Sequence, residues 1–240
     1  MVRSVSKRPL AVAALAALLC GGVAVPAPAA ERPVRLPAPA TDLPAQVVDR
    51  PAQGGTRSVV LAGGCFWGLQ GMFEHVRGVT RVVAGYAGGD AATAHYGAVG
   101  SGETGHAESV KIDYDPAVIS YGQLLQLFFS TAHDATQVGG QGPDSGPQYR
   151  SAIFVADAAE RRVAAGYIVE LGGSGLLHST ITTTLEPLRG FYPAEDYHQD
   201  YLIHHPDSLY IVMNDQPKIT ALHRLYPDLY RNTPVMLASE

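Results

Sequence analysis

The sequence predicts an α+β fold, a two-layer split βαβ arrangement (ferredoxin-like plait) with long functional loops. The main observation is the order of the segments, which runs strand–helix–strand twice before a further helix and strand. Residues 108–115 (ESVKIDYD) alternate apolar and polar side chains, which is typical of a strand with one buried face. Two connections, 87–106 and 132–149, are long, and long loops in a compact domain are usually functional.

The first half of the predicted domain contains a strand, a helix and a second strand before the alternating one. Residues 57–63 (RSVVLAG) predict a short buried strand that ends in glycines. Residues 66–76 (FWGLQGMFEHV) place apolar side chains at helical spacing. Residues 79–89 (VTRVVAGYAGG) predict a strand that runs into a glycine loop.

Helix-start signals mark the second half of the domain. Ser120 and Gln123 resemble a capping box, and Asp157 with Glu160 marks a second helix start. The elements expected here are a helix over 121–132, a strand over 151–157, a helix over 158–171 and a strand within 179–188 (STITTTLEPL).

Residues 1–30 have the layout of a secretory signal peptide. Three cations, Arg3, Lys7 and Arg8, precede an apolar run that is followed by the small-x-small cleavage signal APA at 27–29. The apolar run is shorter than the roughly 20 residues that a membrane span needs, so a retained anchor is the less favoured alternative. We therefore expect export to the periplasm or the extracellular space after cleavage.

The chain has two cysteines, and we expect only one of them in the mature protein. Cys20 lies in the apolar run of the signal peptide, and Leu18-Leu19 precede it where a lipid-modified cysteine normally follows a small residue. Cys65 then has no partner for an internal disulfide. An unpaired cysteine in an exported protein is a candidate reactive thiol.

The chain is predicted to have four segments. They are the signal peptide (1–30), a Pro/Ala-rich linker expected to be mostly disordered (31–55), the main domain (56–203) and a C-terminal extension packed on that domain (204–240). In the extension, Ile219, Leu222 and Leu225 form a packing stripe. Loss of the three N-terminal cations would change the formal charge from -5 to -8, so no nucleic-acid partner is indicated. We expect a monomer.

Cys65 lies between the first predicted strand and the helix that follows it. Free backbone N–H groups and the helix dipole at such a junction favour a thiolate and lower the pKa of the thiol. Gly63 and Gly64 lack side chains, so a ligand can approach the sulfur closely. The alternative is that this lone cysteine is a small buried hydrophobic residue.

Seven motifs in this order resemble the methionine sulfoxide reductase A family over roughly residues 57–203. They are GGCFWG, GYAGG at 85–89, HYGAV at 95–99, GETGHAESV at 102–110, YDPAVISYGQLL at 114–125, QGPDSGPQYRSAIF at 141–154 and YPAEDYHQDYL at 192–202. Members of this family reduce the S epimer of methionine sulfoxide. The resemblance therefore implies a peptide-methionine (S)-S-oxide reductase, an oxidoreductase whose substrate is free or protein-bound.

The resemblance also implies the reacting groups. Cys65 would be the nucleophile that attacks the sulfoxide sulfur. Glu108 would be the acid that protonates the sulfoxide oxygen, since a carboxyl group near an apolar pocket has a raised pKa. Tyr96 and Tyr149 would hydrogen-bond the same oxygen.

Four further residues match the family pattern. Asp144 matches a polar group near the backbone amide of the substrate, although it could equally be an ordinary turn aspartate. Phe66 and Trp67 match the aromatic pocket that receives the substrate methyl group. Exchange of methyl and oxygen would put each in the wrong environment, which explains the choice of epimer. For His198 we expect a structural hydrogen bond.

The chain departs from the family in one respect: many members carry resolving cysteines near the C-terminus, and residues 208–240 contain none. Attack by Cys65 would still release methionine and leave a sulfenic acid. An external thiol must then attack the sulfenic acid, and a second thiol must resolve the mixed disulfide. We expect no bound cofactor. The donor would be a small thiol or a thiol-disulfide carrier of the cell envelope.

Two other classes of protein remain open. One is another single-cysteine thiol enzyme, such as a peroxidase or a hydrolase, although His75 and His106 lie in no hydrolase-like motif. The other is a non-catalytic binder of oxidised methionine. No metal site is predicted, because the histidines lack the spacing of metal ligands, and the adjacent His204 and His205 would not share one face of a regular element.

Overall fold

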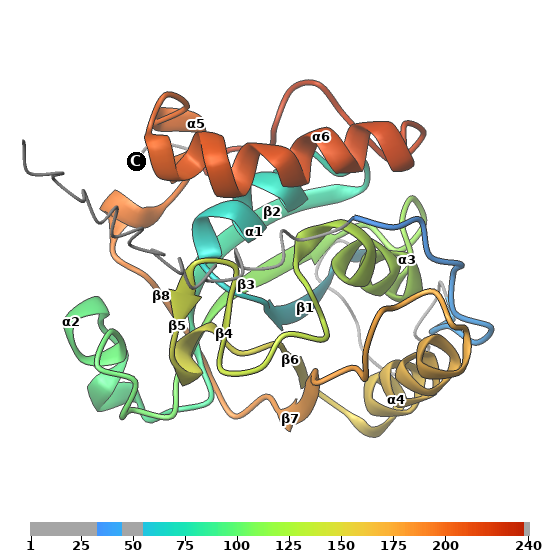
Figure 1. Ribbon diagram of the computed structural model, residues 1–240, viewed down its shortest axis with the longest axis horizontal. Helices are drawn as coiled ribbons and strands as arrows, with labels where there is room; N and C mark the ends of the chain where they lie inside the picture. The colour runs from blue at the N-terminus through green and yellow to red at the C-terminus, as the bar shows by residue number, and fades with distance from the viewer. Residues whose placement is uncertain (1–32, 45–54, 238–240) are drawn as a thin grey trace, which may run out of the picture.

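A six-stranded sheet forms the centre of the protein, whose computed structural model describes residues 33–44 and 55–237. Its strands lie in the order β7-β6-β1-β3-β2-β8. They are β1 (Arg57–Ala62), β2 (Val79–Ala87), β3 (Ala107–Tyr114), β6 (Ala152–Val155), β7 (Thr184–Pro187) and β8 (Phe191–Pro193). Neighbouring strands are antiparallel, except that β6 and β7 are parallel. The architecture is therefore mixed α/β, with a curved sheet (Figure 1).

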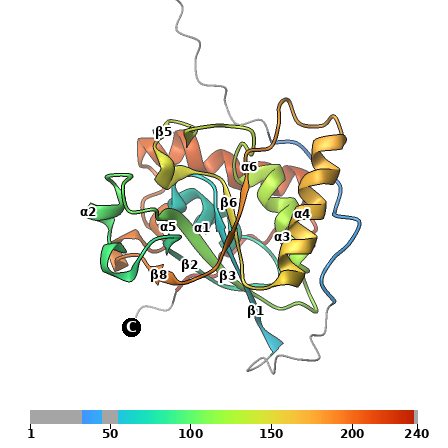
Figure 2. The ribbon, with the colours of Figure 1, turned by 90° about the horizontal axis from the view of Figure 1, so that it is seen from below.

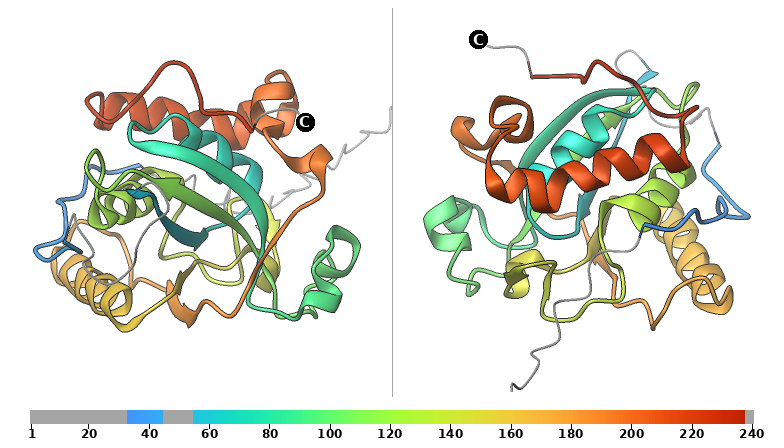
Figure 3. Two further views of the ribbon diagram at one scale, coloured as in Figure 1. Left: turned by 180° about the vertical axis from the view of Figure 1, so that it is seen from behind. Right: turned by 45° about the horizontal axis from the view of Figure 1, so that its top comes forward.

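Helices connect and cover these strands. The helices are α1 (Phe66–Glu74), α2 (Tyr96–Val99), α3 (Tyr121–Leu127), α4 (Ala158–Gly173), α5 (Tyr201–His204) and α6 (Gln216–Leu225). Helix α6 lies across α1 on the outside of the molecule, and α2 stands apart on its own loop (Figure 1, Figure 3). Leu222 of α6 is fully buried, and Ile219 and Leu225 pack against the same core, as the expected stripe requires.

Short elements complete the chain. They are the 3₁₀ turns η2 (Ala91–Thr93), η4 (Pro147–Tyr149) and η5 (Asp196–His198), the π-helical turns η3 (Phe128–Ala132) and η6 (Ile211–Asp215), and the hairpin of β4 (Gly140–Gln141) and β5 (Asp144–Ser145). The turn η3 continues α3, and η6 leads directly into α6.

Both helix-start signals read from the sequence are confirmed. The Ser120 hydroxyl accepts a hydrogen bond from Gln123 N at 3.1 Å, and the Gln123 side chain accepts one from Ser120 N at 3.0 Å. Asp157 caps α4 by accepting from the N–H groups of Ala159 and Glu160. Such caps satisfy N–H groups that the first helical turn leaves without partners. The alternating strand is also confirmed, since β3 buries Val110, Ile112 and Tyr114.

The structure differs from the prediction at the end of the domain. The last strand is shorter than 179–188, because β7 covers only Thr184–Pro187 at the edge of the sheet. Just before it, Thr182 bonds to another loop: its N–H donates to Ala135 O at 2.8 Å and its hydroxyl to Gln137 O at 2.8 Å. These bonds hold the preceding residues against the connection 132–149 instead of the sheet.

Residues 33–44 lie against the domain, where the sequence composition predicted disorder. Leu36 is 1% exposed, and its backbone exchanges hydrogen bonds with the Tyr226 hydroxyl at 3.1 and 3.2 Å. Gln126 donates to Leu36 O at 2.7 Å, and the Tyr167 hydroxyl donates to Pro37 O at 2.6 Å. This segment therefore touches α3, α4 and the end of α6 (Figure 1, Figure 2). Two predicted segments lie outside the described residues: the signal peptide, and the part of the linker at 45–54 that precedes β1.

Among the residues that the structure describes, no helix combines the length and the apolar character needed to cross a membrane.

Candidate active site

Cys65 occupies the N-cap position of α1, immediately after β1 and its two glycines. Gly64 has a φ of +94°, and a Cβ at this position would lie 2.7 Å from Cγ of Gln141. A Cβ at Gly63 would lie 2.9 Å from Cγ of His133. The glycines therefore allow the connection 132–149 to pack against the turn that carries the cysteine. This packing role adds to the one expected from the sequence, which is close approach of a ligand to the sulfur.

Glu108 lies beside the same helix start, on the neighbouring part of β3. Glu108 is only 3% exposed, and its Oε2 accepts a hydrogen bond from the backbone N–H of Phe66 at 3.1 Å. Burial raises the pKa of Glu108 to about 8, against the lowering effect of the Phe66 N–H; the charges of Asp144 and Asp215 raise it further. At neutral pH this carboxyl group is therefore protonated in most molecules and able to donate a proton.

The pKa of the Cys65 thiol is raised well above its ordinary value, so the predicted lowering is wrong. Burial is the main cause, followed by the charges of Glu108 and Asp215, and Asp144 adds a smaller contribution. The N–H of Trp67 lowers the pKa but does not outweigh these effects. The local helix start, which is visible in the sequence, favours a thiolate. The opposing carboxyl groups come from β3, β5 and η6, which are distant in sequence.

Tyr96 and Tyr149 approach the site from two loops. Tyr96 begins α2 and is 41% exposed; its backbone N–H donates to Oε1 of Glu195 at 2.9 Å. Tyr149 ends η4. Burial is the main cause that raises the pKa of each hydroxyl, and Glu108 and Cys65 both contribute further. The two tyrosines therefore lie in the electrostatic neighbourhood of the thiol and the carboxyl group, and both hydroxyls remain protonated donors.

Asp144 lies on β5 and has partners that an ordinary turn aspartate would lack. Its Oδ2 accepts a hydrogen bond from the Tyr210 hydroxyl. Burial raises the pKa of Asp144, while this hydrogen bond and the charge of Lys218 lower it. Asp144 in turn contributes to the raised pKa of Cys65, so its carboxyl group belongs to the same cluster.

Phe66 and Trp67 lie in an aromatic cluster at the first turn of α1. The Phe66 ring lies 5.1 Å from the His198 ring, measured between centroids. Trp67 stacks on Tyr201 at 3.8 Å and meets the edge of Tyr210 at 5.8 Å. The indole Nε1–H donates to Nδ1 of His198 at 3.1 Å. Burial lowers the pKa of His198, which keeps this nitrogen free to accept, and the expected structural hydrogen bond is confirmed.

Three residues at the site were not recognised in the sequence, and all belong to the segment after 203. Tyr210 bonds to Asp144 and packs on Trp67. Asp215 and Lys218 are buried; the charge of Asp215 acts on Cys65, and that of Lys218 acts on Asp144. In the sequence of this segment only the apolar stripe stands out, because the family motifs end before it. A single signal was present: Asp215 and Lys218 are three residues apart, a spacing at which opposite charges meet on a helix.

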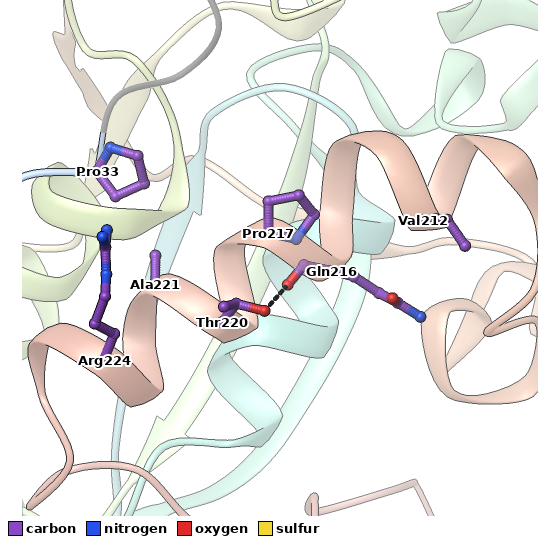
Figure 4. A pocket seen from close by; sticks show the side chains of 7 residues that line it. All are labelled: Pro33, Val212, Gln216, Pro217, Thr220, Ala221 and Arg224. Atoms are coloured by element: carbon purple, nitrogen blue, oxygen red, sulfur yellow. Dashed lines mark hydrogen bonds between the residues drawn. The ribbon is translucent and has the colours of Figure 1, made fainter.

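No group of three or more His, Cys, Asp or Glu side chains is placed to hold a metal ion within 33–44 and 55–237. A pocket of about 470 Å³ lies elsewhere, on the outer side of η6 and α6. It is lined by Pro33, Val212, Gln216, Pro217, Thr220, Ala221 and Arg224 (Figure 4). None of the predicted site residues contributes to it, so it is separate from the candidate active site.

Comparisons with known proteins identify the family of this chain. The sequence model described as "Peptide methionine sulfoxide reductase" matches residues 57–228. A peptide methionine sulfoxide reductase MsrA 2 of Mesorhizobium japonicum is 50% identical over 192 residues, which cover 80% of this chain and 98% of the relative. An MsrA 2 of Synechocystis is 51% identical over 174 residues, or 72% of this chain and 81% of the relative.

Solved structures of similar proteins extend the comparison to the fold. Reduced Mxr1 from Saccharomyces cerevisiae superimposes with a TM-score of 0.59 at 31% identity, covering 69% of this chain and 94% of the other. Methionine sulfoxide reductase A of Corynebacterium diphtheriae gives a TM-score of 0.55 at 36% identity, covering 65% and 77%. The protein is thus an enzyme of the oxidoreductase class. It belongs to the peptide methionine sulfoxide reductase family.

Proposed function

We propose that this protein reduces the S epimer of methionine sulfoxide, free or within proteins, to methionine. The observation that carries the proposal is the position of Glu108. Its carboxyl group is bonded to the N–H of the residue that follows Cys65, and its pKa of about 8 keeps it protonated at neutral pH. A nucleophile and a proton donor are therefore held side by side, as reduction of a sulfoxide requires. Family membership supplies the substrate class.

The proposed reaction transfers one oxygen atom. The Cys65 sulfur attacks the sulfoxide sulfur while Glu108 gives a proton to the sulfoxide oxygen. Overall, thiol and sulfoxide become sulfenic acid and thioether. The cysteine sulfur loses two electrons, the methionine sulfur gains two, and the oxygen ends on Cys65. The raised thiol pKa means that the nucleophile is mostly a protonated thiol before substrate enters.

The remaining site residues would orient the substrate. The hydroxyls of Tyr96 and Tyr149 would donate hydrogen bonds to the sulfoxide oxygen, and Asp144 would meet the backbone amide of the substrate. The Phe66 and Trp67 rings would receive the methyl group. Support comes from the shared electrostatic neighbourhood of both tyrosines with Cys65 and Glu108 and from the aromatic cluster around Trp67. With oxygen and methyl sites on different sides, only one configuration at sulfur fits both.

This arrangement predicts strong selectivity between the two epimers. With a thiol donor present, S-methionine sulfoxide should be turned over at least about a hundredfold faster than the R epimer, because misplacing the oxygen leaves buried polar groups unpaired. Resolving the two epimers by chromatography during the reaction measures this ratio. Hydrogen peroxide serves as the comparison substrate. Faster turnover of peroxide than of either sulfoxide would favour a thiol peroxidase, and release of one methionine per protein with no further turnover would favour a binder.

Recycling of Cys65 is proposed to depend on a thiol from outside the chain. Cys65 is the free cysteine of the described residues, and the segment after 203, where many members carry resolving cysteines, has none. The donor thiol would attack the sulfenic sulfur and release water, and a second thiol would then displace Cys65 from the mixed disulfide. A small thiol or an envelope thiol-disulfide carrier could supply both.

We therefore expect a monothiol to support repeated turnover and thioredoxin to support it weakly. Steady-state rates with each donor at matched thiol concentration measure the difference. Turnover with thioredoxin that equals or exceeds turnover with the monothiol would contradict the recycling scheme while leaving the reductase activity intact.

We also propose that the central strands form the two-layer split βαβ plait named above. Strand β3 lies between β1 and β2, and β1 lies between β3 and β6. The pairs β1–β3, β2–β3 and β1–β6 are all antiparallel, which supports two interleaved strand–helix–strand units. Strands β7 and β8 would then extend the plait at its edges. An experimental structure in which this strand order differed would overturn the proposal.

The site of action is proposed to lie outside the cytoplasm, where the protein would act as a monomer. The layout of residues 1–30 supports export, with cleavage near Ala29 or Ala30. Sequencing the N-terminus of the protein recovered from the envelope or the medium tests this, and a full-length N-terminus there would support the anchored alternative. Sedimentation equilibrium of the same material tests the monomer.

A further inference from the structure

The C-terminal segment places a buried ion pair beside the first turn of α1. Asp215, at the end of η6, is 1% exposed, and Lys218 of α6 is also buried. The Lys218 Nζ lies 3.8 Å from Oδ1 of Asp215 and donates to Asn214 O at 3.2 Å. Burying a carboxylate is costly without such compensation. Lys218 therefore allows Asp215 to carry its charge inside the protein.

Gly68 makes room for this carboxylate at the start of α1. Gly68 is the third residue of the helix, and a Cβ there would lie 2.1 Å from Oδ1 and 2.7 Å from Cγ of Asp215. The carboxylate thus lies against the backbone of the turn whose N-cap is Cys65. This is the end of the helix where the partial positive charge of the backbone is concentrated. A negative charge placed here offsets the field that would favour a thiolate at Cys65.

We propose that Asp215 is a positioning residue for the reaction: held against Gly68 by Lys218, it restrains the ionisation of Cys65 in the free enzyme. A nearby negative charge disfavours a thiolate by direct repulsion. The shift of the Cys65 pKa agrees with this. Burial raises the pKa most, the charge of Glu108 comes next, and the charge of Asp215 follows. In the described part of the chain, the other groups coupled to the thiol are Glu108 on β3, Asp144 on β5, Tyr149 on η4, Tyr96 on α2 and Tyr210 of the tail. His198 on η5 packs on Phe66, and Lys218 of α6 pairs with Asp215.

This restraint has a use in an enzyme with a single cysteine. The thiolate is the form that alkylating agents and peroxides attack, so a protonated thiol is protected while no substrate is bound. Only this benefit rests on the proposed catalytic role of Cys65; the effect of Asp215 on the ionisation of the thiol does not. Ionisation itself is measured without substrate, so a failed reductase assay and a failed ionisation test are distinguishable.

The test is the pH dependence of Cys65 alkylation by iodoacetamide, in which the sulfur forms a bond to carbon and iodide leaves. Full-length wild type and Asp215→Asn are compared, with the extent of reaction read from the mass of the peptide that contains Cys65. Asparagine keeps the shape and removes the charge. The midpoint of the alkylation profile should shift to lower pH in Asp215→Asn. The alkylation rate at pH 7 should rise about threefold or more, because each unit by which the pKa of Cys65 falls increases the thiolate fraction about tenfold. An unchanged or higher midpoint overturns the proposal.

Asp207→Asn is the matched control, since Asp207 is an exposed carboxylate of the same segment and should leave the midpoint unchanged. If Asp215→Asn does not fold, the double variant Asp215→Asn/Lys218→Met replaces it, because it leaves no unpaired buried charge. Its midpoint should also fall, because the Asp215 carboxylate lies against the helix start that carries Cys65 and raises the pKa of the thiol. A midpoint at or above that of wild type in the double variant overturns the proposal equally. Faster inactivation of either variant by peroxide is the second expected readout.

Discussion

Replacement of Cys65 by serine is expected to abolish turnover of S-methionine sulfoxide, with a loss on the order of 10⁴-fold or more, as for other enzymes that lose their nucleophile. A serine hydroxyl is a far weaker nucleophile than a thiol at neutral pH, and Glu108 beside it is mostly protonated and so is not a base for it. The fold should be retained, since serine fits a partly exposed N-cap position and is favoured there. The measurement is the rate of methionine formation with excess thiol.

Cys20→Ser is the matched control for this variant. It removes the other cysteine of the chain, which lies in the predicted signal peptide, and should leave the rate unchanged. If Cys65→Ser retained activity while Cys20→Ser lost it, the nucleophile and the whole site would have to be reassigned. Single-turnover measurements without added thiol give a second criterion: wild type should release one methionine per chain and Cys65→Ser none.

The second large effect is expected for Glu108→Gln, which should lower kcat by about 10²–10⁴-fold, the range for loss of a general acid. Glutamine can still accept the hydrogen bond from Phe66 N through its amide oxygen, so the geometry of the helix start should survive. It cannot supply the proton that the sulfoxide oxygen needs. Glu103→Gln, an exposed carboxyl group in the same loop motif, should have no effect.

The pH profile separates the acid role from a structural one. The active form of Glu108 is the protonated form, and its folded-state pKa is raised to about 8. Activity that depends on it should therefore be full well below pH 8 and fall as the pH rises through about 8. In Glu108→Gln this limb should disappear, because the residue no longer titrates. A near-normal rate, or an unchanged alkaline limb, would remove Glu108 from the acid role.

Local signals predicted the core elements well. The alternation of residues 108–115 located β3 and its buried face, and the capping residues Ser120 and Asp157 located two helix starts. These features depend on neighbours within a few positions in the chain. Strand β8 was not predicted, because it has three residues and exists through pairing with β2. The end of the predicted helix 121–132 is a π-helical turn, which apolar periodicity does not distinguish from an α-helix.

The site was predicted as far as family motifs extend. The structure brings Glu108, Asp144, Tyr96 and Tyr149 into the electrostatic neighbourhood of Cys65. The ionisation of the thiol was predicted in the wrong direction, since the helix start is visible in the sequence and the converging carboxyl groups are not. The tail residues were missed for the same reason. Their importance follows from the packing of η6 and α6 over α1, which no pattern within the tail specifies.

The contacts of Leu36 with Tyr226 bear on how the chain is made. The two partners are 190 positions apart, so the N-terminal segment cannot dock until nearly the whole polypeptide has left the ribosome. Closing so long a loop also carries a larger entropic cost than closing the loops within the sheet. During synthesis, and during the export proposed above, residues 33–44 would therefore stay undocked. The N-terminal segment would dock beside α6 only after this last helix has formed.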